Sequence, residues 1–122
     1  SGNPRACAAI CAVLDVFEEE RIVEKARTAA KLVGERLCGL PGKFPFVKAV
    51  RGEGLVYGVE IENAERANRC VLEAYYGTGD TGVHFLGPLA GKVLRVSPPL
   101  IISESEIYEA FAIIEEAWAR IV

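Results

Sequence analysis

The sequence predicts an α+β layer sandwich, an α/β sandwich in which helices cover a small antiparallel-rich sheet. Two apolar, β-rich runs surround a glycine-bearing turn in the middle of the chain, and helical patterns stand at both ends. With 122 residues, the chain has the length of a single domain and can bury a core. The predicted order is helix, helix, hairpin, helix, two short strands and helix.

The residue pattern of the N-terminal part of the chain predicts two helices. Asn3 can cap the first N–H groups of a helix, and Pro4 is preorganised for its first position. This helix is expected to run to the acidic cluster at 18–20. Apolar residues at helical spacing predict a second helix over 22–40. Its end is predicted by Gly39, Pro41 and Gly42.

The residue pattern in the middle of the chain predicts a β-hairpin followed by a helix. The runs 46–50 and 55–61 favour antiparallel strands joined by a turn at 51–54. Within the second run, Gly58 has no side chain to pack, which predicts that something approaches that face closely. We expect a helix over 63–76. A flexible glycine-rich loop at 77–82 and two short strands, 83–86 and 93–96, are expected to follow.

The last helix has the clearest local signals. Ser103 and Glu106 form a capping box, and Ile102 and Ile107 are placed for a hydrophobic staple across it. Apolar residues then recur at spacings of four and three, which predicts a stripe that packs on a sheet or a neighbouring helix. This stripe comprises Ile107, Phe111, Ile114, Trp118 and Ile121.

The first helix does not fit a self-sufficient domain. Positions 6–14 carry no polar side chain except two thiols. A helix that is apolar all round is normally buried on every side, and a sandwich of this size covers only one or two of its faces. The remainder would be an exposed apolar patch, which usually marks an interface. The sequence therefore predicts that a partner surface is missing.

Composition and charge argue against several classes of partner. The net charge is −3 and the basic residues are scattered, which argues against nucleic acid and anionic membranes. The longest apolar run, 6–14, is less than half of the roughly 20 residues of a membrane span. The cysteines (Cys7, Cys11, Cys38 and Cys70) include no CxxC pair and there is one histidine, which argues against zinc. We expect Cys7 and Cys11 to be small buried thiols, reduced in a cytoplasm.

Most of the side chains and loops that could bind a ligand or act in catalysis are better explained as parts of the structure. The loop 77–82 matches G-x-G-x-x-G, but the nucleotide pattern needs a strand before it and a helix after it, the reverse of the order here. His84 has no nucleophile placed to pair with it, and we expect a partly buried structural histidine. The lysines are expected to be solvated, namely Lys25, Lys31, Lys43, Lys48 and Lys92. We assign no catalytic, metal-binding or cofactor-binding residue.

Arg95 is the one candidate for substrate binding. If Leu94 and Val96 face the core, Arg95 points to the other side of its strand, close to the rigid Pro98 and Pro99. A guanidinium on a stiff scaffold suits bidentate capture of a carboxylate. The alternative is an ordinary strand-edge arginine paired with a surface acid.

Three ordered segments carry a family resemblance: SGNPRACAA at 1–9, VRGEGLVYGVE at 50–60 and VLRVSPPLII at 93–102. They resemble the C-terminal third of class-III pyridoxal-phosphate aminotransferases of the ornithine, 4-aminobutyrate and acetylornithine type. The closing capped helix also matches, so the resemblance covers essentially the whole chain. It implies that residues 1–122 are the small C-terminal domain of a fold-type-I homodimer, with the N-terminal large domain missing.

The resemblance implies transfer of an amino group, often an ω-amino group, from an amine or amino acid to a 2-oxo acid such as 2-oxoglutarate. In the family, the large domain supplies the Schiff-base lysine and most of the pyridoxal phosphate pocket, so the chain alone is expected to be inactive and to bind no cofactor. Arg95 matches the family arginine that engages a substrate carboxylate and in several members switches to a glutamate of the large domain. The first helix would lie between small domain, large domain and partner subunit.

Two other functions remain open from the residues alone. The first is a stand-alone α+β ligand-binding or interaction module without catalytic activity. The second is a regulatory domain that binds a small carboxylate through Arg95.

Overall fold

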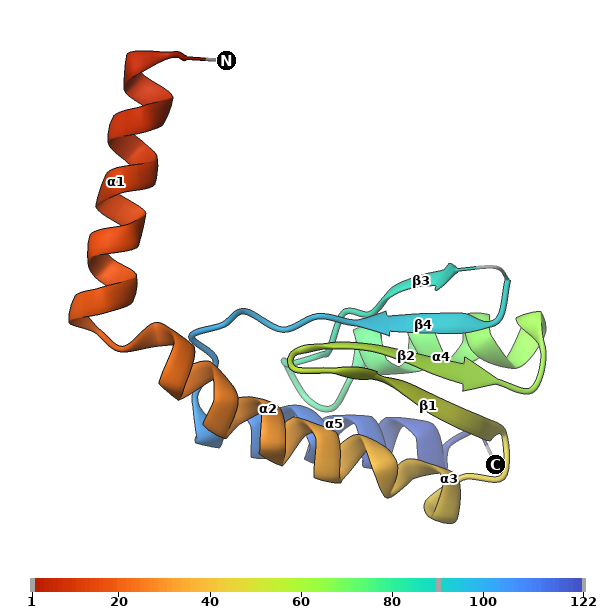
Figure 1. Ribbon diagram of the computed structural model, residues 1–122. Helices are drawn as coiled ribbons and strands as arrows, with labels where there is room; N and C mark the ends of the chain where they lie inside the picture. The colour runs from red at the N-terminus through yellow and green to blue at the C-terminus, as the bar shows by residue number, and fades with distance from the viewer. Residues whose placement is uncertain (1, 90, 122) are drawn as a thin grey trace.

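The computed structural model describes residues 2–89 and 91–121. Several helices pack on one face of an antiparallel sheet, and the N-terminal helix projects away from it (Figure 1). The strands pair in the order β1-β2-β4-β3. This arrangement confirms the predicted α+β class. The elements are α1 (Pro4–Glu19), α2 (Ile22–Cys38), α3 (Leu40–Lys43), β1 (Val47–Glu53), β2 (Val56–Ile61), α4 (Ala64–Tyr76), β3 (Leu86–Leu89), β4 (Val93–Val96) and α5 (Glu104–Ala119).

The core lies between the sheet and the helices and is centred on Trp118 of α5. This side chain is fully buried, and its ring centroid lies 5.8 Å from that of Phe44, 5.9 Å from Phe46 and 5.6 Å from Phe85. Its indole N–H donates a hydrogen bond to the Cys70 carbonyl oxygen of α4 at 3.1 Å. A buried tryptophan with its polar group satisfied thus joins two helices to segments that lead into the sheet.

Helix α1 projects away from this core (Figure 1) and has no buried residue. Its apolar side chains are exposed, with Ile10 58 %, Val13 53 % and Leu14 60 % accessible. The helix begins as predicted, since the Asn3 side chain accepts a hydrogen bond from the Arg5 N–H at 2.9 Å. The expectation of buried thiols at Cys7 and Cys11 is wrong, because nothing in the described chain packs on this helix beyond its C-terminal end.

The second helix differs from its predicted end. It stops at Cys38, and Leu40–Lys43 then form a separate helical turn, α3. Pro41 is compatible with this turn, since the missing N–H of a proline is not needed in the first turn of a helix. Leu40 is fully buried, so core packing continues where the sequence favoured a helix end.

The first of the two short strands was predicted three residues too early. β3 spans Leu86–Leu89 instead of 83–86. The Val83 N–H donates to the Ala74 carbonyl oxygen at 2.7 Å, which ties this segment to the end of α4 instead of to β4. The sheet begins only after the chain has left that helix.

The glycine-rich loop forms a closed turn between α4 and the segment before β3. Thr78 and Thr81 exchange backbone hydrogen bonds of 2.9 and 3.2 Å. Gly77 has a φ of +63°, and a Cβ on it would overlap the Thr81 carbonyl oxygen. Gly79 has a nearly identical φ of +60° but faces open space. Gly77 also has a ψ of −142°, so an alanine there would meet both backbone strain and a steric clash, whereas an alanine at Gly79 would meet no clash.

We predict that Gly77→Ala lowers the free energy of unfolding by about 1–3 kcal/mol more than Gly79→Ala. Both variants force a non-glycine residue to a positive φ, but only the first drives a methyl group into backbone. Urea unfolding of the two variants measures the difference. Equal losses of stability would contradict the closed turn.

The predicted capping box of α5 is present. The Ser103 hydroxyl accepts from the Glu106 N–H at 3.2 Å, and the Glu106 carboxylate accepts from the Ser103 N–H at 2.9 Å. The bond from the Ser103 backbone N–H holds the pKa of Glu106 below its usual value of 4.5. Because the pKa is lowered in the folded state, this contribution to stability is present above the usual value and is lost as the pH falls through the lowered one.

We therefore expect Glu106→Gln to lose less stability on acidification than the unmodified chain does. Urea unfolding from neutral pH to below the usual glutamate pKa of 4.5 measures this dependence. Glu109→Gln, an exposed position of the same helix, is the control and should keep the full acid dependence. Identical acid profiles for Glu106→Gln and the unmodified chain would count against the carboxylate's role.

Candidate functional site

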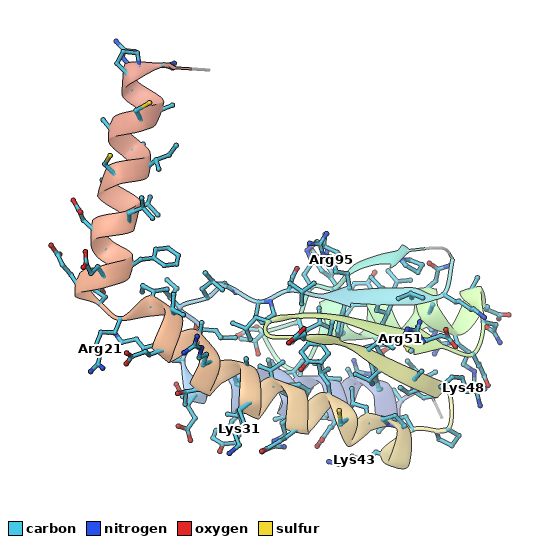
Figure 2. All side chains as sticks on the ribbon, in the orientation of Figure 1. Arg21, Lys31, Lys43, Lys48, Arg51 and Arg95 are labelled. Carbon is cyan, nitrogen blue, oxygen red and sulfur yellow. The ribbon has the colours of Figure 1, made fainter. Side chains whose placement is uncertain are left out.

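Arg95 lies on the sheet face that no helix covers. Its strand, β4, stands between β2 and β3, and Arg95 is paired with Gly58 on one side and Leu86 on the other. The neighbouring Leu94 is fully buried, so Arg95 points away from the core and is exposed. Figure 2 shows its side chain on the opposite side of the sheet from Lys31 of α2. The predicted orientation is correct, and the strand is an interior one.

The charge of Arg95 is not neutralised by a neighbouring acid within the described residues. Six ion pairs are present there, and each joins another basic residue to a glutamate. An arginine paired with a surface acid, the alternative considered from the sequence, is thus not observed. The guanidinium keeps its donors available for an anionic group.

A cavity of about 280 Å³ adjoins Arg95 at the end of β4. Its wall includes Arg95, His84, Ser97 and Pro98, and its floor is made of buried apolar side chains of α2 and α5. A mainly apolar cavity with a few polar groups at its wall is typical of small-molecule sites. The two prolines after Ser97 restrict the backbone at this point, which stiffens the strand end that carries Arg95.

His84 is exposed, so the prediction of a partly buried histidine is wrong. Val83 and Phe85 on either side face the core, which turns the imidazole outward. Its ring lies 5.9 Å from that of Tyr75 in an edge-to-face arrangement. No hydrogen bond of the His84 ring is present in the described part of the chain, and nothing there gives it a catalytic partner.

A neighbouring group does approach Gly58 closely, as predicted, and it belongs to the same sheet. A Cβ at this position would lie 3.2 Å from Cγ1 of Val93 on the neighbouring strand. The close neighbour is therefore a side chain of this same domain. The Val93 side chain therefore occupies part of the space over Gly58.

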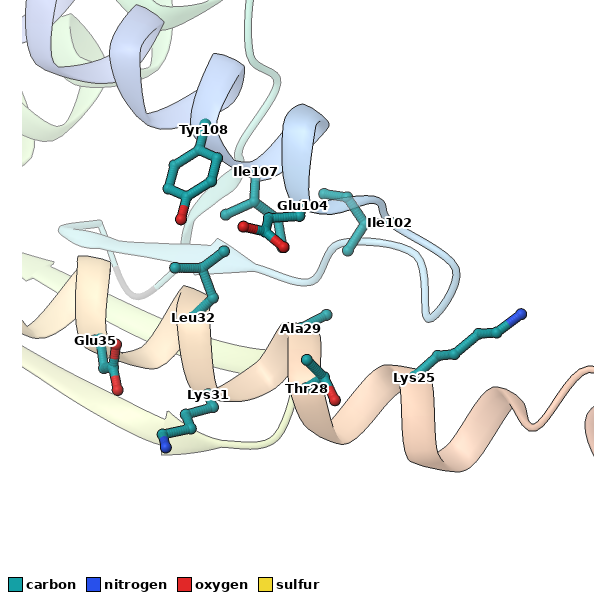
Figure 3. A pocket seen from close by; sticks show the side chains of 10 residues that line it. All are labelled: Lys25, Thr28, Ala29, Lys31, Leu32, Glu35, Ile102, Glu104, Ile107 and Tyr108. Carbon is teal, nitrogen blue, oxygen red and sulfur yellow. The ribbon is translucent and has the colours of Figure 1, made fainter.

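A second recess, of about 470 Å³, lies between α2 and the start of α5 (Figure 3). Ala29, Leu32 and Ile107 form part of its wall, and the Lys25 side chain extends away from it (Figure 3). The recess is on the helix side of the molecule, away from Arg95. Its polar groups are of mixed charge and do not converge, so we assign it no function.

The described residues do not fit pyridoxal phosphate by themselves. The cavity beside Arg95 has no lysine in its wall, and the five lysines considered from the sequence are all exposed. A Schiff-base lysine instead needs a site that depresses its pKa. Within residues 2–89 and 91–121, no cluster of three metal-binding side chains occurs, and no helix is long and apolar enough to cross a membrane.

Cys70 is the only strongly perturbed titratable group among the described residues. Burial raises the pKa of its thiol to about 12, against a smaller opposing effect of Arg66 and Arg69. The thiol therefore stays protonated and acts as a small apolar side chain. Sequence reasoning gave Cys70 no role, because its burial depends on how α4 packs against α5.

Comparison with known proteins connects this geometry to one family. The profile of class-III aminotransferases matches residues 1–118. The acetylornithine aminotransferase of Synechocystis is 36 % identical over 99 % of this chain and 28 % of its own length. The (R)-1-hydroxy-2-aminoethylphosphonate ammonia-lyase of Vibrio splendidus is 33 % identical over 98 % of this chain and 26 % of its own length.

Solved structures agree with the sequence matches. The acetylornithine aminotransferase of Elizabethkingia anophelis superposes with a TM-score of 0.86 at 30 % identity, over 98 % of this chain and 30 % of that one. The ornithine aminotransferase of Toxoplasma gondii gives a TM-score of 0.83 at 29 % identity, over 99 % of this chain and 28 % of that one. The chain thus spans between a quarter and a third of these relatives. It belongs to the class-III aminotransferase family.

Proposed function

We propose that residues 1–122 act as the small C-terminal domain of a class-III aminotransferase whose large domain holds pyridoxal phosphate. The reaction is the transfer of an amino group, often an ω-amino group, to a 2-oxo acid such as 2-oxoglutarate. The names of relatives support this substrate class, since they include ornithine, 5-aminovalerate and diaminobutyrate–2-oxoglutarate aminotransferases. The observation that carries the proposal is Arg95 on the uncovered sheet face, unpaired within the described chain.

Arg95 binds the carboxylate of the amino donor or of the 2-oxo acid. Two parallel N–H donors fix both the position and the orientation of such a group. A fixed orientation matters because the reacting atoms lie elsewhere on the substrate and must be held at a definite distance from the cofactor. The cofactor itself supplies an electron sink for the chemistry. This chain contributes positioning and charge, and the large domain contributes the catalytic lysine.

Helix α1 is the surface that the large domain and the second subunit of a homodimer cover. A recess of about 290 Å³ supports this role. It is lined only by apolar residues, namely Ala12, Val13, Val16, Phe17, Ile22, Leu100 and Ile101. Exposed apolar surface of this kind normally marks an interface. The four free cysteines support a reducing compartment such as the cytoplasm as the place of action.

A lyase reaction is the second candidate, favoured by the ammonia-lyase relative. Arg95 suits a phosphonate as well as a carboxylate, because both offer two oxygens to the guanidinium fork. A stand-alone binding module is less well supported, since α1 would then expose its apolar surface to water.

Arg95 is tested in a fusion of residues 1–122 to the large domain of the Synechocystis acetylornithine aminotransferase. We expect Arg95→Gln to keep the absorbance of bound pyridoxal phosphate and to lower kcat/KM for 2-oxoglutarate roughly 10- to 100-fold, the loss of a charged hydrogen-bond pair. Arg27→Gln, an exposed position on α2, is the control. An unchanged kcat/KM in Arg95→Gln would exclude the proposed role. Activity with phosphonates alone would favour the lyase.

The chain by itself is expected to bind no pyridoxal phosphate, to show no transamination, and to self-associate through α1. Leu14→Glu, which places a charge in the apolar surface, should shift the sedimentation of the chain toward the monomer. Stoichiometric binding of pyridoxal phosphate to this chain would contradict the proposal that the large domain holds the cofactor. A monomeric chain that binds no apolar dye would contradict the role of α1.

A further inference from the structure

The cavity at the end of β4 reaches into the core between the sheet and two helices. Its volume is about 280 Å³, and side chains that are at most 4 % exposed form its floor. These are Val33 and Leu37 of α2, Phe85 before β3, and Ile107, Phe111 and Ile114 of α5. The volume lies just below the range of about 300–1,000 Å³ that is usual for small-molecule sites, so the cavity suits a ligand of about one ring.

Polar side chains are confined to the mouth of this cavity. His84, Arg95 and Ser97 are the polar residues around it, and all three are exposed. The two prolines that follow Ser97 have no N–H group to donate. The carbonyl oxygen of the second, Pro99, already accepts a hydrogen bond from the Ile102 N–H at 3.1 Å. The interior of the cavity therefore offers mainly apolar contacts.

The floor of the cavity contains nothing that needs a water molecule. Among the described residues, no buried side-chain nitrogen or oxygen lacks a hydrogen-bond partner. Water in an apolar cavity loses its hydrogen bonds, so cavities of this kind stay dry and take up apolar molecules. A ligand that fills the space also restores the dispersion contacts that the lining side chains lack. Both effects favour an apolar ligand.

We propose that this cavity binds a small neutral molecule with an aromatic or branched aliphatic body. The body lies against Phe85, Phe111 and Ile114, and any polar group of the ligand stays at the mouth beside Ser97. The ligand is uncharged because a charge on the floor would lose its hydration and find no partner there. The inference goes beyond the proposed function and is independent of it, since it assigns no contact to Arg95.

Two alanines of α5 provide matched positions for a test. Ala110 is half-buried and lines the cavity, whereas Ala112 is exposed. Ala110→Leu extends a side chain into the space of the ligand and should weaken its binding about tenfold or more. Ala112→Leu adds the same group outside the cavity and is the control. Val96→Thr keeps the shape of the wall but adds a hydroxyl group, and it should weaken binding about threefold even if Ala110→Leu folds poorly.

The test is a titration of the full chain with toluene, followed by NMR of the methyl signals. Toluene should shift the signals of Val33, Ile107 and Ile114 until they saturate. Pyrimidine, a polar ring of similar size, should leave these signals unchanged. We expect Arg95→Gln and Ala112→Leu to bind toluene as the unmodified chain does, and Ala110→Leu and Val96→Thr to bind it more weakly.

Three results would overturn the inference. Toluene shifts confined to the methyl groups of α1, or equal weakening by Ala110→Leu and Ala112→Leu, would show adsorption to exposed apolar surface instead of binding in the cavity. Loss of toluene binding in Arg95→Gln would show that the cavity is only a part of the carboxylate site. The role of Arg95 in binding a carboxylate is tested separately in the fusion enzyme, so the two proposals can fail independently.

Discussion

Residues 6–14 of helix α1 carry an apolar surface on all sides, and the rest of the described chain leaves them exposed. An isolated helix of this length gains little stability in water without tertiary packing, and we therefore propose that a surface outside the domain covers it. The remaining helices and the sheet share a core around Trp118. We infer that the chain combines a sandwich with a core of its own and one helix that a partner surface covers.

The sheet, like the chain as a whole, has one part that is packed in the core and one part that is left uncovered. One face of the sheet holds the core, and the other face, which no helix covers (Figure 1), carries Arg95 (Figure 2). An antiparallel sheet tolerates an open face, and here that face carries the groups suited to anions. Because β4 is paired on both sides, the direction in which Arg95 projects is set by two neighbouring strands. In the proposed role of this chain as a small aminotransferase domain, the open face is the wall that binds a substrate carboxylate, and the large domain holds the cofactor.

Features specified by neighbouring residues could be predicted from the sequence. The Asn3–Pro4 start of α1 and the Ser103–Glu106 capping box are present because their hydrogen bonds join residues two or three positions apart. Features that depend on tertiary packing could not be predicted. The helical turn after Cys38, the later start of β3 and the exposure of His84 all follow from contacts with distant elements.

The candidate site shows the same limit. Alternation along β4 was enough to predict which way Arg95 points, since Leu94 is buried beside it. The position of Arg95 on an interior strand, opposite Gly58 and Leu86, required the order and register of the strands, which alternation within one strand does not specify.

Hydrogen exchange of the α1 amides tests the central claim most directly, measured at concentrations where the chain is monomeric and again with a class-III large domain present. We predict that the α1 amides exchange nearly as fast as an unstructured peptide in the chain alone, while those around Trp118 are protected. With the large domain present, α1 should become protected as well. Strong protection of α1 in the isolated monomer, or no change on adding the large domain, would contradict the claim that this domain is completed by a partner.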